Sequence, residues 1–288
     1  MAQYQGVYYD MTTDEYHADP CPEPSLSASI AETIWRESPN HARNEHPRLN
    51  PNFEPTNKKA FDLGSAAHAV LLENSLDSFV IIKADDYRAK AAQQQRDEAY
   101  DKGLIPILEK DVGEVLIMAS TANTFLADTE LSDIFTDGNP EVTILEFSDG
   151  FWKRGRLDWL TGDRQIILDY KTGAGSSKPQ AWIRQQLFSR NCDIQAHLYR
   201  YINWKTGGPK DASFIWLVQE NKKPYACSLV GASPAVLASG KEKWRYAAHK
   251  WKWCSEFNKW PSHDNRIHWA EPPAWTMAEV EERKNSDE

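Results

Sequence analysis

The order of apolar and polar positions along the chain predicts helices in the first half and a run of strands after residue 140. Residues 59–73 (KAFDLGSAAHAVLLE) carry apolar side chains at helical spacing, among small residues that allow close packing. Residues 83–128 have long polar and amphipathic helical patterns, with Pro106 as a break. This part of the chain predicts a helical elaboration and no chemistry of its own.

A shorter helix is predicted near the N-terminus, running toward Glu37. Ser27 or Ser29 can cap its first turn, and Ser29 has Glu32 three residues later, as a capping box requires. Pro39 is then expected to help end this helix.

Three runs rich in β-branched and aromatic residues follow, at residues 141–147 (EVTILEF), 151–160 (FWKRGRLDWL) and 165–171 (QIILDYK). The turn sequences SDG and TGDR separate them. We therefore expect a three-stranded meander.

The last third of the chain predicts a helix, a hairpin and a second helix. Residues 178–204 are helical in pattern and stop near the glycines at 207–208. The runs SFIWLVQE and YACSLVG predict a hairpin that turns at residues 221–224. Residues 235–260 predict an amphipathic helix packing on the sheet, with one stripe formed by Trp244, Ala248, Trp251 and Cys254 or Ser255.

The composition is that of a globular chain, with 41% hydrophobic residues, 26% charged residues and 12 Trp. No stretch approaches the roughly 18 apolar residues that span a bilayer, and the N-terminus lacks a basic segment followed by an apolar one. We expect a cytosolic protein with no membrane partner.

Four widely spaced cysteines without a CxxC pair favour free thiols over a zinc ribbon or a disulfide framework: Cys21, Cys192, Cys227 and Cys254.

Charge is unevenly distributed. The net charge of -9 argues against nucleic acid, which relies on Lys and Arg for phosphate binding. Residues 151–205, however, contain ten Lys and Arg against four Asp. This basic segment indicates either a local anion site or a solvated helix face with chance clustering, and charge alone does not decide between them.

Candidate chemistry lies at the ends of the predicted strands. Asp158 is near the end of the second strand, and Asp169 and Lys171 are at the end of the third. Side chains alternate across a strand, so Asp169 and Lys171 share a face. Acids buried without partners are costly, and a hard cation held by the carboxylates would relieve that cost.

The same group suits phosphodiester hydrolysis. Bound Mg²⁺ lowers the pKa of a water and neutralises charge on the phosphate oxygens. A nearby lysine positions or deprotonates that water and adds positive charge to the transition state. The alternative is an edge-strand salt bridge between Asp169 and Lys171, because D-x-K alone is a common sequence.

The order and spacing of several segments resemble the nuclease domain of the RecB and exonuclease VIII (RecE) type within the PD-(D/E)XK superfamily. These segments are LSASIAETIWRESPNHA, LGSAAHAVLLE, Glu141, RLDWL, ILDYKTG and IQAHLYRYI, and together they cover about Leu26 to Glu220. The single-domain phage or prophage exonuclease VIII type is the most similar, because of the FDLGSAAH element and the overall size.

The resemblance implies a set of site residues. His68 matches a metal ligand on the helix before the sheet, and Asp158 and Asp169 match the two metal-binding acids. The backbone carbonyl of Tyr170 matches a further oxygen ligand, and Lys171 matches the catalytic lysine. Without the resemblance, a histidine amid Ala and Leu is more often a core residue satisfied by one hydrogen bond.

Three more residues are implied. Glu141 matches an acid that serves a second metal directly or through water, although it could be a solvated acid at a strand edge. Gln195 and Tyr199, four apart on one helix face, match a Q-x-x-x-Y element over the active site that touches DNA phosphate or the nucleophile. Their alternative is ordinary helix packing, with Tyr199 in the core.

The implied cofactor is Mg²⁺, for which Mn²⁺ can substitute. Many RecB-like relatives bind an iron–sulfur cluster through one Cys before a Pro and three Cys near the C-terminus. Here the first position is Ser38, and the other cysteines are too scattered, so no iron–sulfur cluster is expected. No GxxxxGK[ST] motif is present, so we expect no helicase activity.

The fold expected is α/β, a mixed central sheet flanked by helices as in the PD-(D/E)XK core, with an N-terminal helical elaboration. We expect a single nuclease domain over residues 1–288. Its helical part would cover 1–140, the catalytic sheet and flanking helices 141–260, and a C-terminal tail 261–288.

The implied function is degradation of linear double-stranded DNA from an end, 5′ to 3′, leaving a 3′ single strand for recombination. Polarity and end dependence follow from the resemblance alone. The same resemblance implies a ring-shaped homo-oligomer (trimer or tetramer), a single-strand annealing protein as partner, and the cytoplasm of a bacterial host. The alternatives are a single-strand exonuclease or structure-selective endonuclease with the same active site, or a catalytically silent DNA-binding module.

Overall fold

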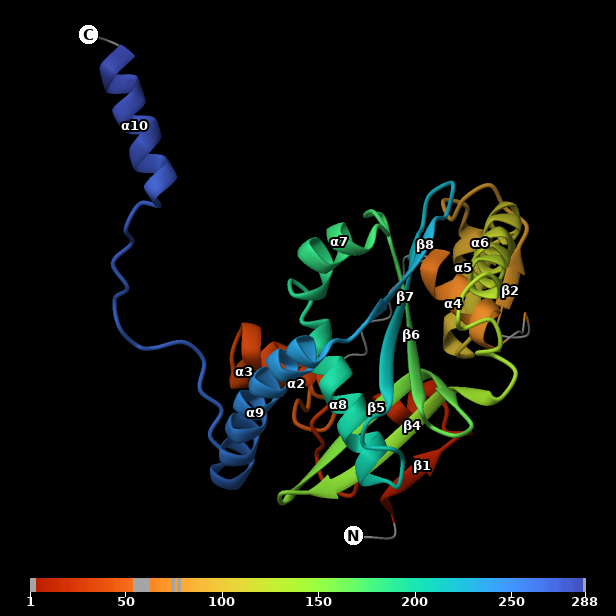
Figure 1. Cartoon of the computed structure of the whole chain (residues 1–288), viewed down its shortest axis with the longest axis horizontal. Coiled ribbons are helices and arrows are strands. Elements are labelled where there is room, and N and C mark those ends of the chain that lie inside the picture. The colour runs from red at the N-terminus through yellow and green to blue at the C-terminus, as the bar shows by residue number, and fades with distance from the viewer. Residues whose placement is uncertain (1–3, 54–62, 74–75, 77–78, 287–288) are drawn as a thin grey trace.

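A computed structural model describes residues 4–53, 63–73, 76 and 79–286 (Figure 1). Its centre is a six-stranded sheet in the order β1-β4-β5-β6-β7-β8, in which β6 and β7 are parallel and the other neighbours antiparallel. The strands are β1 (Gly6–Tyr8), β4 (Gly138–Ser148), β5 (Phe151–Thr161), β6 (Ile166–Gly173), β7 (Ser213–Glu220) and β8 (Cys227–Gly231). The predicted mixed sheet, its meander and its hairpin are confirmed.

Helices cover both faces of this sheet (Figure 1). One face shares a core with α2 (Ala28–Arg36), α8 (Cys192–Lys205) and α9 (Pro234–Phe257). The other packs against α4 (Leu63–Glu73) and α6 (Glu109–Ala127). The remaining helices are α1 (Thr13–His17), α3 (Pro39–Glu45), α5 (Lys90–Asp101), α7 (Pro179–Trp182), the π-helical turn Ile183–Leu187 and α10 (Ala274–Ser286).

The helix predicted near the N-terminus, α2, starts two residues earlier than a capping box at Ser29 would place it. The Ser27 hydroxyl accepts a hydrogen bond from the Ile30 N–H at 3.3 Å, so Ser27 is the cap and the capping box at Ser29 is wrong. Ser38 caps the next helix, which has Pro39 in its first turn. Proline is therefore the start of α3, where its missing N–H has no helical partner to lose.

The region predicted as helix broken at Pro106 contains two strands. β3 (Ile105–Leu108) includes Pro106 and pairs in parallel with β2 (Phe79–Ile82). A two-stranded sheet leaves one edge of each strand unpaired, so a proline can be accommodated there. With β1 in the central sheet as well, the chain before residue 140 is not wholly helical. Positions 59–62 of the predicted helix lie outside the described residues.

The predicted helix over 178–204 is divided. Asn191 has a left-handed backbone (φ 47°) and separates the π-helical turn from α8. The predicted helix over 235–260 is present as α9, and it packs mainly on α8 and α2. No helix in the described part of the chain is long and apolar enough to cross a bilayer.

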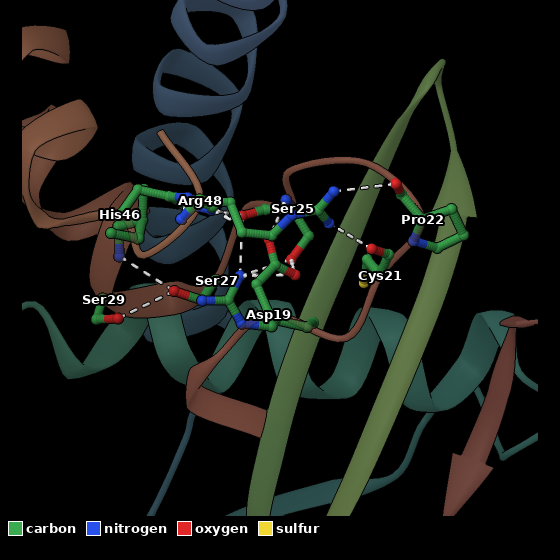
Figure 2. Close-up of polar contacts among 10 residues, drawn as sticks. Asp19, Cys21, Pro22, Ser25, Ser27, Ser29, His46 and Arg48 are labelled. Carbon is green, nitrogen blue, oxygen red and sulfur yellow. Dashed lines mark hydrogen bonds and ion pairs between the residues drawn. The ribbon is translucent and has the colours of Figure 1, made fainter. Parts of the chain in front are cut away.

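A buried polar cluster anchors the segment before α2 (Figure 2). The Asp19 carboxylate accepts hydrogen bonds from the Ser25 N–H at 2.9 Å and the Ser25 hydroxyl at 2.7 Å, and it lies 3.2 Å from His46 Nε2. Arg154 of β5 approaches the same carboxylate to 3.3 Å. These contacts attach the N-terminal segment to β5, the strand that carries Asp158.

Candidate metal and active site

The site lies where β5 and β6 separate. These strands pair at Trp159 with Leu168 and at Leu160 with Ile167, and among the described residues the pairing does not continue to Asp158 and Asp169. Across the gap, Asp158 Oδ2 accepts a hydrogen bond from the Tyr170 N–H at 2.8 Å. A side chain thus replaces a ladder hydrogen bond, and the carboxylates occupy the space between the strands.

His68 and Glu141 meet Asp158 in this space. His68 of α4 places Nε2 3.1 Å from Asp158 Oδ2 and Nδ1 3.5 Å from Glu141 Oε1. One ligand atom from each of the three residues lies within 4.8 Å of the others. Three predicted ligands from distant parts of the sequence therefore converge, and His68 is not a core histidine with a single hydrogen bond.

Glu141 has an unusual backbone. Its neighbours Pro140 and Val142 pair with Trp159 and Leu157, so Glu141 lies opposite Asp158 on the adjacent strand. Its φ of 53° is in the left-handed region, which a residue with a side chain rarely adopts within a strand. Such strain is concentrated at functional sites.

Asp169, Lys171 and Gln195 form a second group next to the first. Lys171 Nζ is 2.8 Å from Asp169 Oδ2, and Gln195 Nε2 donates to Asp169 Oδ1 at 2.8 Å. Tyr170 points to the opposite face, where its hydroxyl contacts Gln219. The predicted alternation along β6 is confirmed, and Asp169 lies outside the cluster of three ligands.

Tyr199 brings α8 against the sheet, and its predicted contact with DNA phosphate or the nucleophile stays a prediction. Its side chain is buried, and its ring lies on Gly155 of β5. A Cβ at Gly155 would come within 2.8 Å of Tyr199 Cε1, so the close approach requires glycine. Gln195, one turn earlier on α8, is thereby brought to Asp169.

Arg156 is a site residue that the sequence analysis missed. Its Nε lies 2.5 Å from Glu141 Oε2, and its Nη1 donates to the Met11 carbonyl at 2.8 Å and the Thr143 hydroxyl at 3.0 Å. Arg156 is two positions before Asp158 on the same strand and so shares its face. The alternation of side chains along this strand was the signal in the sequence that could have identified Arg156.

Burial and charge set the protonation of the site. Burial alone would lower the pKa of His68, but the Asp158 carboxylate, followed by Glu141, outweighs it and raises this pKa to about 9. Burial raises the pKa of Glu141, and raises that of Asp169 to about 6 in spite of Lys171. The site therefore has an excess of negative potential, which the His68 proton offsets.

The donor set fits a hard divalent cation. Carboxylate oxygens and one imidazole nitrogen are ligands that such ions take, and an ion would supply the positive charge otherwise held by His68. Among the residues that the structure describes, Asp169 Oδ2 is buried without a hydrogen bond and has only its ion pair with Lys171. An oxygen with unused acceptor capacity beside the cluster is consistent with a further ligand.

The basic segment is mostly turned inward. Lys153 lies 3.1 Å from Glu146, and Arg164 donates to the Asn203 side chain at 2.8 Å. With Arg154, Arg156 and Lys171, these cations bind groups within the protein. The segment is therefore neither a single anion site nor a solvated helix face. Its exposed cations are Lys178, Arg184, Arg190 and Lys205.

A pocket of about 190 Å³ opens beside Lys171. It is bounded by the end of β6, the helical segment after it and the start of α8. Its lining includes the exposed Arg190 and the partly buried Gln186, a cation and an amide suited to phosphate oxygens. Lys171, the predicted catalytic lysine, thus borders a space that is open to a ligand.

Comparisons with known proteins agree with this architecture. A family model described as "PDDEXK-like domain of unknown function (DUF3799)" matches residues 31–270. A search of curated proteins finds no match. A crystal structure from Eubacterium rectale, described as a "Putative exonuclease", aligns with a TM-score of 0.57 at 14% identity, over 93% of this chain and 98% of that chain. The crystal structure of SSO0001 aligns with a TM-score of 0.35 at 10% identity, over 85% of this chain and 88% of that chain.

Proposed function

The chain belongs to the family of PDDEXK-like domains, and from this premise we propose that it is a divalent-metal-dependent deoxyribonuclease. One observation carries the proposal: His68, Glu141 and Asp158 converge within 4.8 Å beside the Asp169–Lys171 pair. An edge-strand salt bridge alone would need neither the histidine nor the left-handed Glu141.

His68, Asp158 and Glu141 would hold the metal, with Asp169 and the Tyr170 carbonyl as further oxygen ligands. Mg²⁺, or Mn²⁺ in its place, would make an attacking water more acidic and offset negative charge on the scissile phosphate. Glu141 could serve a second ion. Arg156 would fix the direction from which Glu141 approaches.

Lys171 has the position to act on the nucleophile and the phosphate. Its ammonium group is held by Asp169 at 2.8 Å and borders the open pocket. From there it would orient the water and stabilise the charge that develops in the transition state. Gln195 holds the other oxygen of Asp169, so it keeps the carboxylate in place.

The substrate proposed is the end of linear double-stranded DNA, cut 5′ to 3′ to leave a 3′ single strand for recombination. The pocket beside Lys171, with Arg190 at its rim, supports a phosphate-bearing substrate. Polarity, the ring-shaped oligomer and an annealing partner are supported by the exonuclease VIII resemblance. A single-strand exonuclease or a structure-selective endonuclease would use the same residues.

One assay tests these alternatives. Linear duplexes labelled at the 5′ or the 3′ end are compared in Mg²⁺ with a closed circle and a labelled single strand. Early release of the 5′ label as a mononucleotide, with the circle intact, is expected. A nicked circle would identify an endonuclease, and preference for the single strand would identify the other exonuclease. Binding without any cleavage would contradict the nuclease proposal.

A further inference from the structure

Exposed cations gather at one end of the central sheet. Residues 170–192, which lead from β6 to α8, contain four Lys and Arg and no Asp or Glu, in a chain of net charge -9. The turn between β7 and β8 adds Lys222 and Lys223. In Figure 1, this turn and the loop before α7 lie at the same end of the sheet. The basic part of the sequence thus continues in space onto a second loop.

Hydrogen bonds hold these two loops together. The Asn221 N–H donates to the Gly173 carbonyl at 2.9 Å, and the Ser177 N–H donates to the Glu220 carboxylate at 2.9 Å. Gly173 also lines the pocket beside Lys171. The loop before α7 and the turn after β7 therefore form one surface, and this surface begins at the edge of the pocket.

The helical segment after the loop turns one side toward the pocket. Trp182, Gln186 and Arg190 follow one another at intervals of four residues, and all three line the pocket. Lys178, at the start of α7, is one interval earlier in the same series. Arg184 is two positions from Gln186 and therefore lies on the opposite side, because successive helical residues are about 100° apart. Four exposed cations are called the cationic rim below: Lys178, Arg190, Lys222 and Lys223.

The side chains of the cationic rim are available to an anion. In the part of the chain that the structure describes, none of the four has an ion pair or a side-chain hydrogen bond. The acids that border the two loops or the pocket lining each have a partner: Glu220 accepts from Ser177, Glu114 accepts from the Tyr225 hydroxyl, and Glu32 pairs with Arg36. The rim therefore presents positive charge that no described group of the protein binds.

We propose that the cationic rim binds backbone phosphates of the DNA strand next to the scissile phosphate. The inference rests on the proposed nuclease function and adds the path of the strand. Lys171 connects the two regions, because its Nζ lies 2.8 Å from Asp169 and its side chain lines the pocket. A strand carries one phosphate for about every 3.4 Å of helix axis, so phosphates beyond the scissile one can reach the pocket and the rim. Such contacts hold the strand in position and read no base sequence.

Binding of a short labelled DNA duplex in Ca²⁺, titrated at several salt concentrations, tests the rim. Lys178→Gln, Arg190→Gln and Lys222→Gln should each weaken binding by roughly 5-fold to 10-fold. Each should also lower the slope of log affinity against log salt concentration by roughly 1, as for the loss of one phosphate contact. The loss should be the same for duplexes of unrelated sequence. Arg184→Gln removes an exposed charge from the opposite side of the same segment, so it is the matched control and should change neither quantity.

Cleavage of the same duplex in Mg²⁺ separates this inference from the nuclease proposal. If the rim variants lose affinity as expected but the wild-type protein cleaves no DNA, the nuclease proposal fails and the rim remains a DNA-binding surface. The rim proposal is overturned if the wild-type protein cleaves DNA while the rim variants keep its affinity and salt dependence. It is also overturned if Arg184→Gln loses as much affinity as the rim variants. A wild-type protein that binds no DNA would overturn both proposals.

Discussion

Arg156 binds Glu141 across two neighbouring strands, with 2.5 Å between Nε and Oε2. The same guanidinium donates to the Met11 carbonyl and the Thr143 hydroxyl, so it is itself fixed by three groups. Glu141 consequently approaches His68 from a defined direction. A carboxylate held in this way is ready to bind a cation without first being ordered.

Arg156→Ala should therefore lower the metal-dependent cleavage rate by roughly 10-fold to 100-fold, the scale seen when groups that orient metal ligands are removed. Metal affinity should change less than the cleavage rate. Loss of the positive charge favours binding of a cation, whereas loss of the fixed orientation of Glu141 disfavours it. Arg164→Ala, which removes an arginine bound to Asn203, is a control for general destabilisation. Unchanged cleavage by a folded Arg156→Ala protein would mean that Arg156 only holds the N-terminal segment against the sheet.

The central residues should separate by role. Asp158→Ala or Asp169→Ala should abolish metal binding and cleavage together, because a small oxygen cage loses an anionic ligand. Lys171→Ala should still bind metal and DNA, while its single-turnover cleavage rate falls by roughly 10² to 10⁴. Calorimetric metal titration and DNA binding in Ca²⁺ provide the comparison, with the exposed Arg184→Ala as control. Normal cleavage by Lys171→Ala would leave this lysine as a structural partner of Asp169.

Cleavage should require a small hard cation. Mg²⁺ or Mn²⁺ should support it, whereas Ca²⁺ should bind without turnover because its looser geometry positions the attacking water poorly. Excess chelator should abolish activity, and added Mg²⁺ should restore it. Full activity in chelator would contradict the proposed mechanism.

Asp19 should make stability depend on pH in acid. Burial alone would raise its pKa, but the bonds from His46, Arg154 and Ser25 outweigh burial and hold this pKa below its ordinary 3.8. A carboxyl group whose pKa is lower in the folded state than in the unfolded state stabilises the folded protein at pH values above the unfolded pKa. This contribution is lost as pH falls below about 4. Wild-type stability should therefore fall in this range through Asp19.

Asp19→Asn is the matched test, because asparagine tolerates the left-handed backbone at this position (φ 64°). Removing the charge leaves Arg154 without its buried partner, and should cost roughly 3–5 kcal/mol in the free energy of unfolding at neutral pH. Urea denaturation of both proteins should show the difference shrinking as pH falls from 7 toward 3. A difference that stays constant over this range would mean that the Asp19 charge does not contribute.

Local patterns in the sequence were enough to predict the central strands and the position of the Asp169–Lys171 pair. The meander from β4 to β6 follows from β-branched runs between turn sequences, and alternation along β6 placed Asp169 and Lys171 together. Both features depend on residues within a few positions of one another. The placement of Asp169 and Lys171 on one face was therefore predictable without knowing the packing.

Competition between local signals was decided by packing. Two serines could cap α2, and in the folded chain the Ser27 hydroxyl accepts the Ile30 N–H while Ile30, Ala31 and Ile34 are buried in the core. Pro106 indicates a helix break in sequence, yet Ile105–Leu108 gains a strand partner in β2 that lies more than twenty residues away. Propensity alone is too weak to decide such cases.

The candidate metal site depends on the tertiary structure. From the residues alone His68 was indistinguishable from a core histidine, and only the resemblance pointed to a ligand. The fold brings α4 over the gap between β5 and β6, so that His68, Glu141 and Asp158 meet although they are far apart in sequence. Arg156 becomes meaningful only when β4 pairs with β5 and places Glu141 beside it. Contacts of this kind are determined by packing across the whole core, because they join residues of different elements.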